Sequence, residues 1–264
     1  MSAESVHRGD EVRGWGTPAA TRVKAVLFDA AGTLFNVRGS VGTIYARIAL
    51  RHGVTADPVE IQREFARAFR ARAADGLMTR GGLGPVSAEK EWWKDVVRMV
   101  FAGRMAGTVM DRYFEDVFEA FRRAESWELF PDTVPCLQGL RSMGCRLGVL
   151  SNFDSRLFEL LDDLRLSTFF ETVIISWRAG SAKPEKEIFM RAAEAMEAAP
   201  NRILHVGDCL TDDYEGARNA GLMAVLLDRS GEYADRDDVT RIGSLLEIPA
   251  FLGCGSRPPD AGCR

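Results

Sequence analysis

Residues 23–34 read VKAVLFDAAGTL, and the two halves of this stretch differ in character. The first six residues, from Val23 to Phe28, form a short apolar run rich in β-branched and aromatic side chains. The run stops at Asp29 and is followed by small residues that end at Gly32. A short apolar run bounded by a turn signal is typical of a strand buried on both faces. We therefore predict a buried strand with a carboxylate at its end.

The same alternation of strand and turn returns after Phe130-Pro131-Asp132 and continues toward the C-terminus. Helical segments near 132–143, 155–163, 185–197 and 211–219 lie between or beside the apolar runs. Strands that alternate with helices predict a parallel sheet covered on both faces, an α/β doubly wound (Rossmann-like) fold. The candidate strands are RLGVLSN (146–152), TVIIS (172–176), ILHVGD (203–208) and MAVLLD (223–228).

Between the first strand and the rest, the pattern is helical from about Ser40 to Trp127. The insert of about ninety residues is too long for a plain loop, so we predict an all-helical cap domain over 38–127. Its aromatic residues recur at helical spacing and are expected to form helix-packing core. The predicted core domain comprises 22–37 and 128–252, and the polar ends, 1–21 and 253–264, are predicted to be a flexible leader and tail.

Composition excludes several classes of protein. The chain of 264 residues is 46% hydrophobic and 27% charged, which is ordinary for a globular protein. Its net charge of −4 gives no general attraction to nucleic acid or to anionic membranes. No apolar run reaches the roughly 18 residues of a membrane span, and the N-terminus lacks the apolar segment of a secretion signal. Five cysteines without a C-x-x-C pair suit a reducing compartment, so a cytoplasmic protein is expected.

Polar residues follow several of the predicted strands. Taken alone, each is common at a turn, but ligands of a doubly wound sheet bind at the carboxyl ends of its strands. A carboxylate there can attack phosphorus, and phosphoryl oxygens need a hydroxyl, an ammonium and a divalent cation to neutralise them. Magnesium prefers such oxygen ligands. The residues are Asp29, Ser151, Asn152, Lys183, Asp208, Asp212 and Asp213.

These residues, in this order, resemble the four motifs of the haloacid dehalogenase superfamily of aspartate-nucleophile hydrolases. FDAAGTL (28–34) is similar to the first motif, LSN (150–152) to the second, the Lys183 loop to the third and GDCLTDD (207–213) to the fourth. The helical insert is similar to the cap of subfamily IA. The stretches EKEWWKDVVRMVF and SNFDSRL resemble the group of haloacid dehalogenase-like hydrolase domain-containing protein three.

The resemblance implies roles for individual residues. Asp29 would be the nucleophile, with Ser151 and Lys183 as its catalytic partners. A small phosphorylated or anionic substrate would be bound by Ser151, Asn152, Lys183, Gly32 and Thr33.

The cofactor implied is Mg²⁺. Its ligands would be Asp29, the backbone carbonyl of Ala31, Asp208 and Asp213, the last directly or through water. The role of Asp212 stays open, as does the oligomeric state.

Ala31 departs from the family pattern. Phosphatases of the family usually carry an aspartate two residues after the nucleophile, which protonates the leaving group and later activates water. General acid–base help is worth about 10²–10⁴-fold, so a phosphatase with Ala31 is expected to be slow.

The departure leaves three alternatives open. Haloacid dehalogenases of the family also lack this aspartate, but their fourth motif lacks the aspartate that matches Asp208. Phosphonoacetaldehyde hydrolases have alanine there but need a cap lysine, and the only candidates are Lys90 and Lys94. The third alternative is a phosphate-binding or partner-binding protein without turnover. We expect a magnesium-dependent hydrolase of the phosphatase type.

Overall fold

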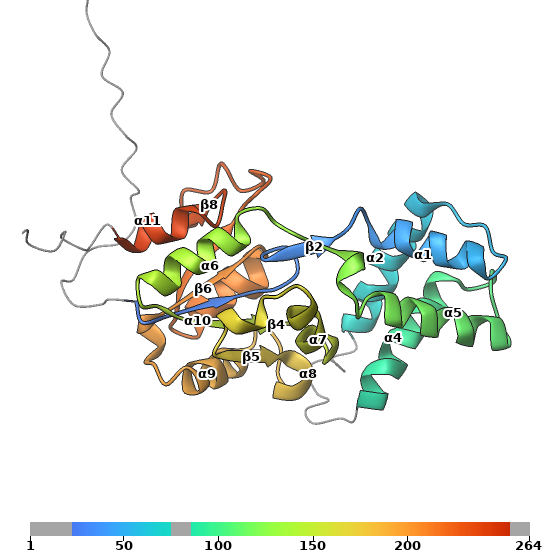
Figure 1. Cartoon of the computed structure of the whole chain (residues 1–264), viewed down its shortest axis with the longest axis horizontal. Helices are drawn as coiled ribbons and strands as arrows, with labels where there is room; N and C mark the ends of the chain where they lie inside the picture. Colours follow the sequence, from blue (N-terminus) through green and yellow to red (C-terminus); the bar gives the residue numbers. More distant parts are fainter. Residues whose placement is uncertain (1–22, 75–85, 254–264) are drawn as a thin grey trace, which may run out of the picture.

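The computed structural model describes residues 23–74 and 86–253. These residues form a six-stranded sheet in which every neighbouring pair is parallel (Figure 1). The strand order is β5 (Thr172–Ile175), β4 (Arg146–Ser151), β1 (Ala25–Phe28), β6 (Ile203–Gly207), β7 (Met223–Leu227) and β8 (Arg241–Ile242).

Strand β1 lies at the centre of this sheet and is completely buried. The chain builds the sheet outward from β1 through β4 to β5, then returns to its other side with β6. Phe28 is level with Val149 of β4 and with Val206 of β6, so the carboxyl ends of the three strands lie together. The point where the strand order reverses therefore falls at the end of β1, where such folds bind ligands.

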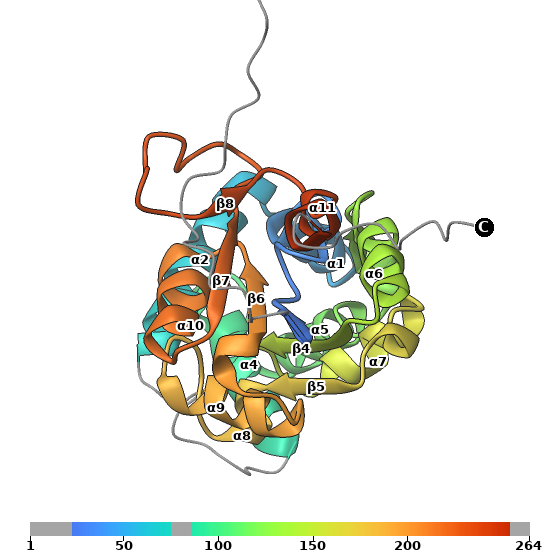
Figure 2. The same ribbon diagram turned by 90° about the vertical axis from the view of Figure 1, so that its left-hand side faces the viewer.

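Helices cover both faces of the sheet, as Figure 2 shows. Along β1 the side chains alternate: Val26 and Phe28 join one apolar cluster, and Ala25 and Leu27 join another. The first cluster includes residues of α6 (Thr133–Ser142), α7 (Arg156–Asp163) and α11 (Glu247–Gly253). The second includes residues of α9 (Lys186–Ala195) and α10 (Gly216–Asn219). The doubly wound α/β class predicted from the sequence is confirmed.

Helices α1 (Val41–Arg51), α2 (Pro58–Ala74), α4 (Val86–Val100) and α5 (Gly107–Ala120) lie together at one end of the molecule, and we call them the helical layer (Figure 1). The chain enters and leaves this layer through an antiparallel pair, β2 (Phe35–Val37) and β3 (Trp127–Leu129). None of the described helices is both long enough and apolar enough to cross a membrane.

Local sequence explains where two of these helices begin. The side chain of Ser40 accepts a hydrogen bond from the backbone N–H of Thr43 and caps α1. Asp57 does the same for α2, since its carboxylate accepts from the N–H groups of Val59 and Glu60 and Pro58 occupies the first helical position. Both starts follow from residue types visible in the sequence.

Several elements differ from the expectation. The pair β2–β3 and the short strand β8 were not predicted, because runs of two or three residues are too short to show a period. The segment 211–219 is a π-helical turn, η4 (Leu210–Glu215), that leads into α10. The predicted leader and all of the predicted tail except Gly253, which ends α11, lie outside the described residues. The remaining short helices are α8 (Ser176–Ala179), η1 (Ala124–Ser126), η2 (Ser167–Phe169) and η3 (Pro200–Arg202).

Candidate active site

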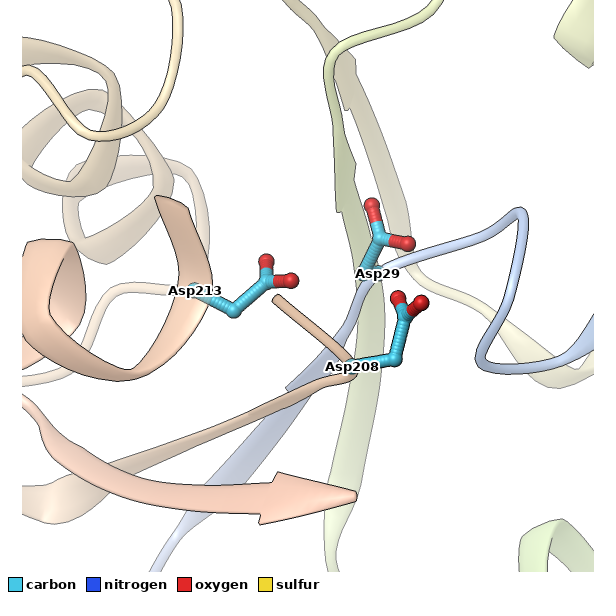
Figure 3. A group of neighbouring side chains, drawn as sticks. All are labelled: Asp29, Asp208 and Asp213. Atoms are coloured by element: carbon cyan, nitrogen blue, oxygen red, sulfur yellow. The ribbon is translucent and has the colours of Figure 1, made fainter. Parts of the chain in front are cut away.

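Three predicted carboxylates meet at the carboxyl ends of β1 and β6. Asp29 directly follows β1, Asp208 directly follows β6, and Asp213 extends toward them from η4 (Figure 3). One oxygen of each carboxylate lies within 4.8 Å of an oxygen of the other two. The fold therefore brings together residues that are up to 184 positions apart in the sequence.

Lys183 is buried among these carboxylates. Its Nζ donates to Oδ1 of Asp29 at 2.6 Å and to Oδ1 of Asp213 at 2.6 Å. Burial lowers the pKa of Lys183, but the two carboxylates outweigh this effect and hold that pKa above its ordinary value. The ammonium group is therefore permanently charged at neutral pH.

Asn152 fixes the backbone at Lys183. Its side-chain amide donates to the carbonyl oxygen of Lys183 at 2.9 Å and accepts from the N–H of Lys183 at 2.9 Å. Asn152 follows β4 directly, so this double hydrogen bond ties the loop that carries Lys183 to the end of the sheet. Asn152 was predicted to bind substrate, whereas in this structure its amide is engaged with the chain itself.

Asp213 is held by three donors. Its Oδ1 accepts from Lys183 and lies 2.9 Å from Nε2 of His205, and its Oδ2 accepts from the N–H of Cys209 at 3.0 Å. Burial would raise the pKa of Asp213, but Lys183 and His205 outweigh it and hold that pKa well below its ordinary value. Asp213 is therefore a fixed anion at neutral pH.

His205 was not predicted to belong to this site. It lies in β6 and is completely buried, and its Nδ1 has no hydrogen-bond partner among the described residues. The signal in the sequence was a polar ring inside an otherwise apolar strand, because a buried polar group needs a partner. Here that partner is the carboxylate of Asp213.

The other two carboxylates have pKa values shifted upward. Burial is the largest cause for Asp29; Lys183 opposes it and Asp213 adds to it. Part of the Asp208 side chain is exposed to solvent, but protein groups around its carboxyl remove water from it, and this desolvation is the largest cause of its raised pKa. The charges of Asp29 and Asp213 add to the effect, and together they raise the pKa of Asp208 to about 7. Perturbed carboxyl groups in one cluster are typical of functional sites.

The loop after β1 is shaped around Asp208. Gly32 has a φ of +92°, and a Cβ at this position would lie 2.3 Å from Oδ2 of Asp208, so only glycine fits. The neighbouring Thr33 donates from its hydroxyl to Oδ1 of Asp208 at 3.3 Å. Gly32 and Thr33 were predicted to bind substrate, and their contacts here are with a carboxylate of the cluster.

The remaining predicted residues lie nearby. Ser151 ends β4 and is buried beside the loop that follows β1. Ala31 lies in that loop, where it pairs with Phe35 in an isolated bridge. Asp212 is half-buried and is not one of the three clustered carboxylates, and burial raises its pKa. Among the described residues, no hydrogen bond of the Ser151 hydroxyl or of the Ala31 carbonyl bears on the roles predicted for them. These roles stay predictions.

The cluster fits a divalent cation. Three carboxylates face one ammonium group, which leaves two negative charges uncompensated when His205 is neutral. Desolvation raises the pKa of Asp208 most, and the negative charges of Asp29 and Asp213 raise it further. The three clustered groups all offer carboxylate oxygens, the donor type that favours Mg²⁺ over zinc or copper.

A cavity of about 220 Å³ lies between this site and the helical layer. Ala31 and Asn152 border it on the side of the sheet, and residues of α1, α2, α4 and α5 border it on the other. The aromatic residues predicted to be helix-packing core are buried or half-buried, and several of them also line this cavity: Phe65, Phe69, Phe114, Phe118 and Phe121.

Beside this cavity, the helical layer is tied by a hydrogen bond to a buried ion pair of the core, a contact that the sequence did not reveal. Arg156 donates to both carboxylate oxygens of Asp154. Trp93 of α4 donates from its indole N–H to Oδ2 of the same carboxylate at 2.6 Å. Close by, Glu89 of α4 accepts a hydrogen bond from the N–H of Ser155 at 3.1 Å.

Comparisons with known proteins identify the family of the chain. Residues 23–221 match the family model of the haloacid dehalogenase-like hydrolases. Haloacid dehalogenase-like hydrolase domain-containing protein 3 of Danio rerio is 32% identical over 235 residues, which cover 87% of this chain and 96% of that protein. The group named from the sequence is therefore confirmed as a relative.

Solved structures show the same fold. A phosphatase from Thermococcus onnurineus has a TM-score of 0.61 at 24% identity, with 87% of this chain and 98% of that one covered. A defluorinating L-2-haloacid dehalogenase has a TM-score of 0.72 at 20% identity, with 90% and 98% covered. These neighbours differ in activity, so they establish the fold and leave the reaction to the site. The match over most of its length, together with the site at the end of β1, shows that the chain belongs to the haloacid dehalogenase-like hydrolase family.

Proposed function

We propose that this protein is a magnesium-dependent phosphatase of small molecules that works through a phosphorylated Asp29. The observation that carries the proposal is the cluster of Asp29, Asp208 and Asp213 around the buried Lys183. A nucleophilic carboxylate beside a dianionic phosphoryl group requires concentrated positive charge. Lys183 provides one charge, and the excess of carboxylates provides a place for a divalent cation.

Each residue has a distinct part in the proposed reaction. Asp29 attacks phosphorus through the carboxylate oxygen that Lys183 does not hold, and the bond to the leaving oxygen breaks. Water then attacks the same phosphorus, and the bond to Asp29 breaks, which releases inorganic phosphate and restores the carboxylate. Lys183 opposes the effect of burial on the pKa of Asp29, which favours the ionised nucleophile, and it would neutralise charge on the phosphoryl oxygens. When bound, Mg²⁺ supplies further positive charge and orients the phosphoryl group. Asp208 and Asp213 would hold it together with Asp29 and the carbonyl of Ala31.

Ser151 and Asn152 complete the proposed phosphoryl site. Ser151 ends a strand adjacent to β1, from where its hydroxyl would donate to a phosphoryl oxygen. Asn152 would act chiefly by holding the backbone at Lys183. Gly32 and Thr33 would support Asp208 rather than the substrate.

Proton transfer to the leaving group is the weak step of this site. Ala31 offers no acid, and none of the lining residues within the described part of the chain carries a carboxyl group. Leaving groups that depart without a proton are therefore favoured. We also propose that residues 38–127 act as a cap domain, because the helices within this range cover the cavity next to Ala31.

The structure supports the other two reactions less well. The cap lysines needed for phosphonate cleavage are already paired: Lys90 with Glu115 at 2.5 Å and Lys94 with Asp111 at 2.9 Å. Neither lysine lines the cavity. A dehalogenase needs no cation, and Asp208 would then add an unneeded negative charge next to the nucleophile.

The test is hydrolysis of an aryl phosphate with and without Mg²⁺ by the wild type, Asp29→Asn and Asp212→Asn. We expect magnesium-dependent turnover that Asp29→Asn abolishes and that Asp212→Asn, outside the cluster, largely retains. Circular dichroism of each variant checks that it is folded. Equal rates for the wild type and Asp29→Asn would contradict the proposal. Phosphate binding without turnover would then indicate the non-catalytic alternative, and release of halide from 2-haloacids a dehalogenase.

A further inference from the structure

The cavity beside Ala31 narrows the class of substrate. We infer that the organic group of the substrate is apolar and uncharged, of about the size of a substituted aromatic ring; the inference rests on the proposed function. The cavity meets the site at Ala31, two residues from Asp29, and at Asn152. A phosphoryl group bound at Asp29 would therefore have its organic group directed into this cavity.

The walls of the cavity are mainly apolar. Val37 and Val41 border it near β2 and the start of α1, and Val97 and Val117 border it from α4 and α5. Aromatic rings of the helical layer provide most of the remaining surface. Ala31 continues this surface where other family members would place a carboxyl group. Apolar walls favour apolar groups, because their contact removes apolar surface from water.

Three of the side chains with polar groups that border the cavity, Trp93, Trp127 and Asn152, have those groups engaged by the protein. The indole N–H of Trp93 donates to Asp154, and that of Trp127 donates to the carbonyl oxygen of Phe121 at 3.1 Å. The side-chain amide of Asn152 is paired with the backbone of Lys183. A ligand hydroxyl that faces these engaged groups and the apolar walls would therefore be buried without a partner, at about 1–3 kcal/mol, which is roughly a 5- to 150-fold loss of affinity.

Among the described residues that line the cavity, Arg156 is the one with a charged side chain, and its charge is balanced. Arg156 is buried against Asp154, with Nε and Nη2 donating to that carboxylate at 2.9 and 2.6 Å. The guanidinium also stacks on rings, 4.9 Å from the centre of Trp93 and 4.3 Å from that of Phe118. Binding a second carboxylate here would bring it next to Asp154. The cavity therefore offers no net positive charge to an anionic group.

The volume of the cavity sets the size of the group. A dry cavity of about 150 Å³ lined by apolar side chains holds one benzene molecule. At about 220 Å³, this cavity has space for an aromatic ring with a short alkyl substituent. Polar substrates of similar size, such as sugar phosphates, fit the volume but not the chemistry of the walls.

The test compares phosphate esters that differ only at the far end of the organic group. Phenyl phosphates with a para-methyl, para-ethyl, para-hydroxymethyl or para-carboxymethyl substituent are hydrolysed by the wild type. We expect kcat/KM to rise up to about fourfold from methyl to ethyl, which corresponds to one buried methylene, and to fall for the hydroxyl and carboxylate. Equal or better hydrolysis of either polar ester would overturn the inference while the proposed function stands.

A filling variant shows that the effect comes from this cavity. Val41→Phe places a ring in the cavity, and Val59→Phe makes the same change at an exposed position of α2 outside it. Val41→Phe should raise KM for the ethyl ester more than for unsubstituted phenyl phosphate, and Val59→Phe should change neither. Equal changes for both esters in Val41→Phe would contradict the inference.

A binding measurement separates this inference from the proposed function. Trp93 and Trp127 line the cavity, so para-ethylphenol should change the tryptophan fluorescence of the protein, including that of Asp29→Asn. Binding that Val41→Phe weakens would support the inference even if no ester were hydrolysed, a result that defeats only the proposed function. No binding of para-ethylphenol by the wild type would overturn the inference whatever the turnover.

Discussion

Trp93 of the helical layer donates a hydrogen bond of 2.6 Å to the buried carboxylate of Asp154, in the loop after β4. This contact joins two parts of the chain that are separate in sequence and border the same cavity. Burial would raise the pKa of Asp154, but Arg156 and the hydrogen bond from Trp93 outweigh it and hold that pKa low. The helical layer is therefore fastened to the core through an anion.

Trp93→Phe should loosen this attachment. The variant loses a hydrogen bond to a charged group, worth about 1.5–3 kcal/mol, while Asp154 keeps its partner Arg156. Trp92→Phe is the matched control, because the indole N–H of Trp92 is buried without a partner among the described residues. We expect chemical denaturation to show a larger decrease in the free energy of unfolding for Trp93→Phe than for Trp92→Phe. Limited proteolysis should cleave the helical layer of Trp93→Phe faster. Equal losses for both variants would show that the hydrogen bond contributes nothing.

Lys183→Met should destabilise the protein in a way that depends on pH. Removing the ammonium leaves Asp29 and Asp213 buried without a counter-charge, which costs about 3–5 kcal/mol at neutral pH. In the variant, the pKa values of both carboxyls rise above their unfolded values. The cost is therefore greatest above those raised pKa values and shrinks as the pH falls and the carboxyls take up protons.

Urea unfolding at pH 7.5 and pH 5 measures this dependence. The free energy of unfolding of Lys183→Met should be lower than that of the wild type, and this difference should be smaller at pH 5 than at pH 7.5. Lys186→Met, at an exposed position three residues on, should be close to the wild type at both values. A deficit that does not change with pH would show that lost packing, rather than uncompensated charge, destabilises the variant.

The sequence predicted five of the six strands of the sheet and the carboxylates and lysine that cluster at their ends, because both depend on local signals. The strand ending at Asp29 and the strand ending at Asp208 are apolar runs with abrupt ends, and parallel pairing places such ends together. It did not predict which groups would pair across the chain. The contact of Trp93 with Asp154 and that of His205 with Asp213 depend on side-chain directions that no period encodes.

The spacing of the aromatic residues in the insert predicted which helix faces are buried but not what those faces contact. It correctly indicated buried helix faces, yet Phe114 and Phe118 both pack against their neighbours and line the cavity. A periodic stripe identifies the face of a helix that leaves water. Whether that face meets another helix or a cavity depends on how the helices are arranged around it, which the stripe does not specify.

Magnesium binding should weaken as the pH falls below 7. Asp208, with its pKa raised to about 7, must lose its proton to bind the cation, so the apparent Kd should rise about tenfold for each pH unit below that value. In the metal-free protein, a lower pH has the opposite effect, because it improves the contribution of Asp208 to stability. A carboxyl whose pKa is raised on folding costs stability above its unfolded value of 3.8, so this contribution improves as the pH falls from 8 to 5.5.

Thermal unfolding with and without Mg²⁺ at pH 8 and pH 5.5 checks both statements. The increase in Tm on adding Mg²⁺ should be large at pH 8 and small at pH 5.5. Asp208→Asn should remove the increase, whereas Asp212→Asn, outside the cluster, should retain it. An equal increase at both pH values would contradict the role given to Asp208.

Ala31→Asp should restore the missing proton donor. The new carboxyl would border the apolar cavity, where loss of hydration raises its pKa and keeps it protonated near neutral pH. A general acid in this position should raise kcat for alkyl phosphates by about 10²–10⁴-fold. The gain should be much smaller for aryl phosphates, whose leaving groups depart as stable anions. The dependence of rate on leaving-group basicity should therefore be steep in the wild type and shallow in the variant.

Ala31→Asn is the control, because it adds nearly the same volume and polarity without an acidic proton. Rates for a series of phosphate esters of increasing leaving-group basicity are compared for the wild type and the two variants. A steep dependence retained in Ala31→Asn and lost in Ala31→Asp assigns the effect to proton transfer. Equal gains in both variants would assign it to a change in cavity shape. No gain in a folded Ala31→Asp protein would mean that leaving-group protonation does not limit this site.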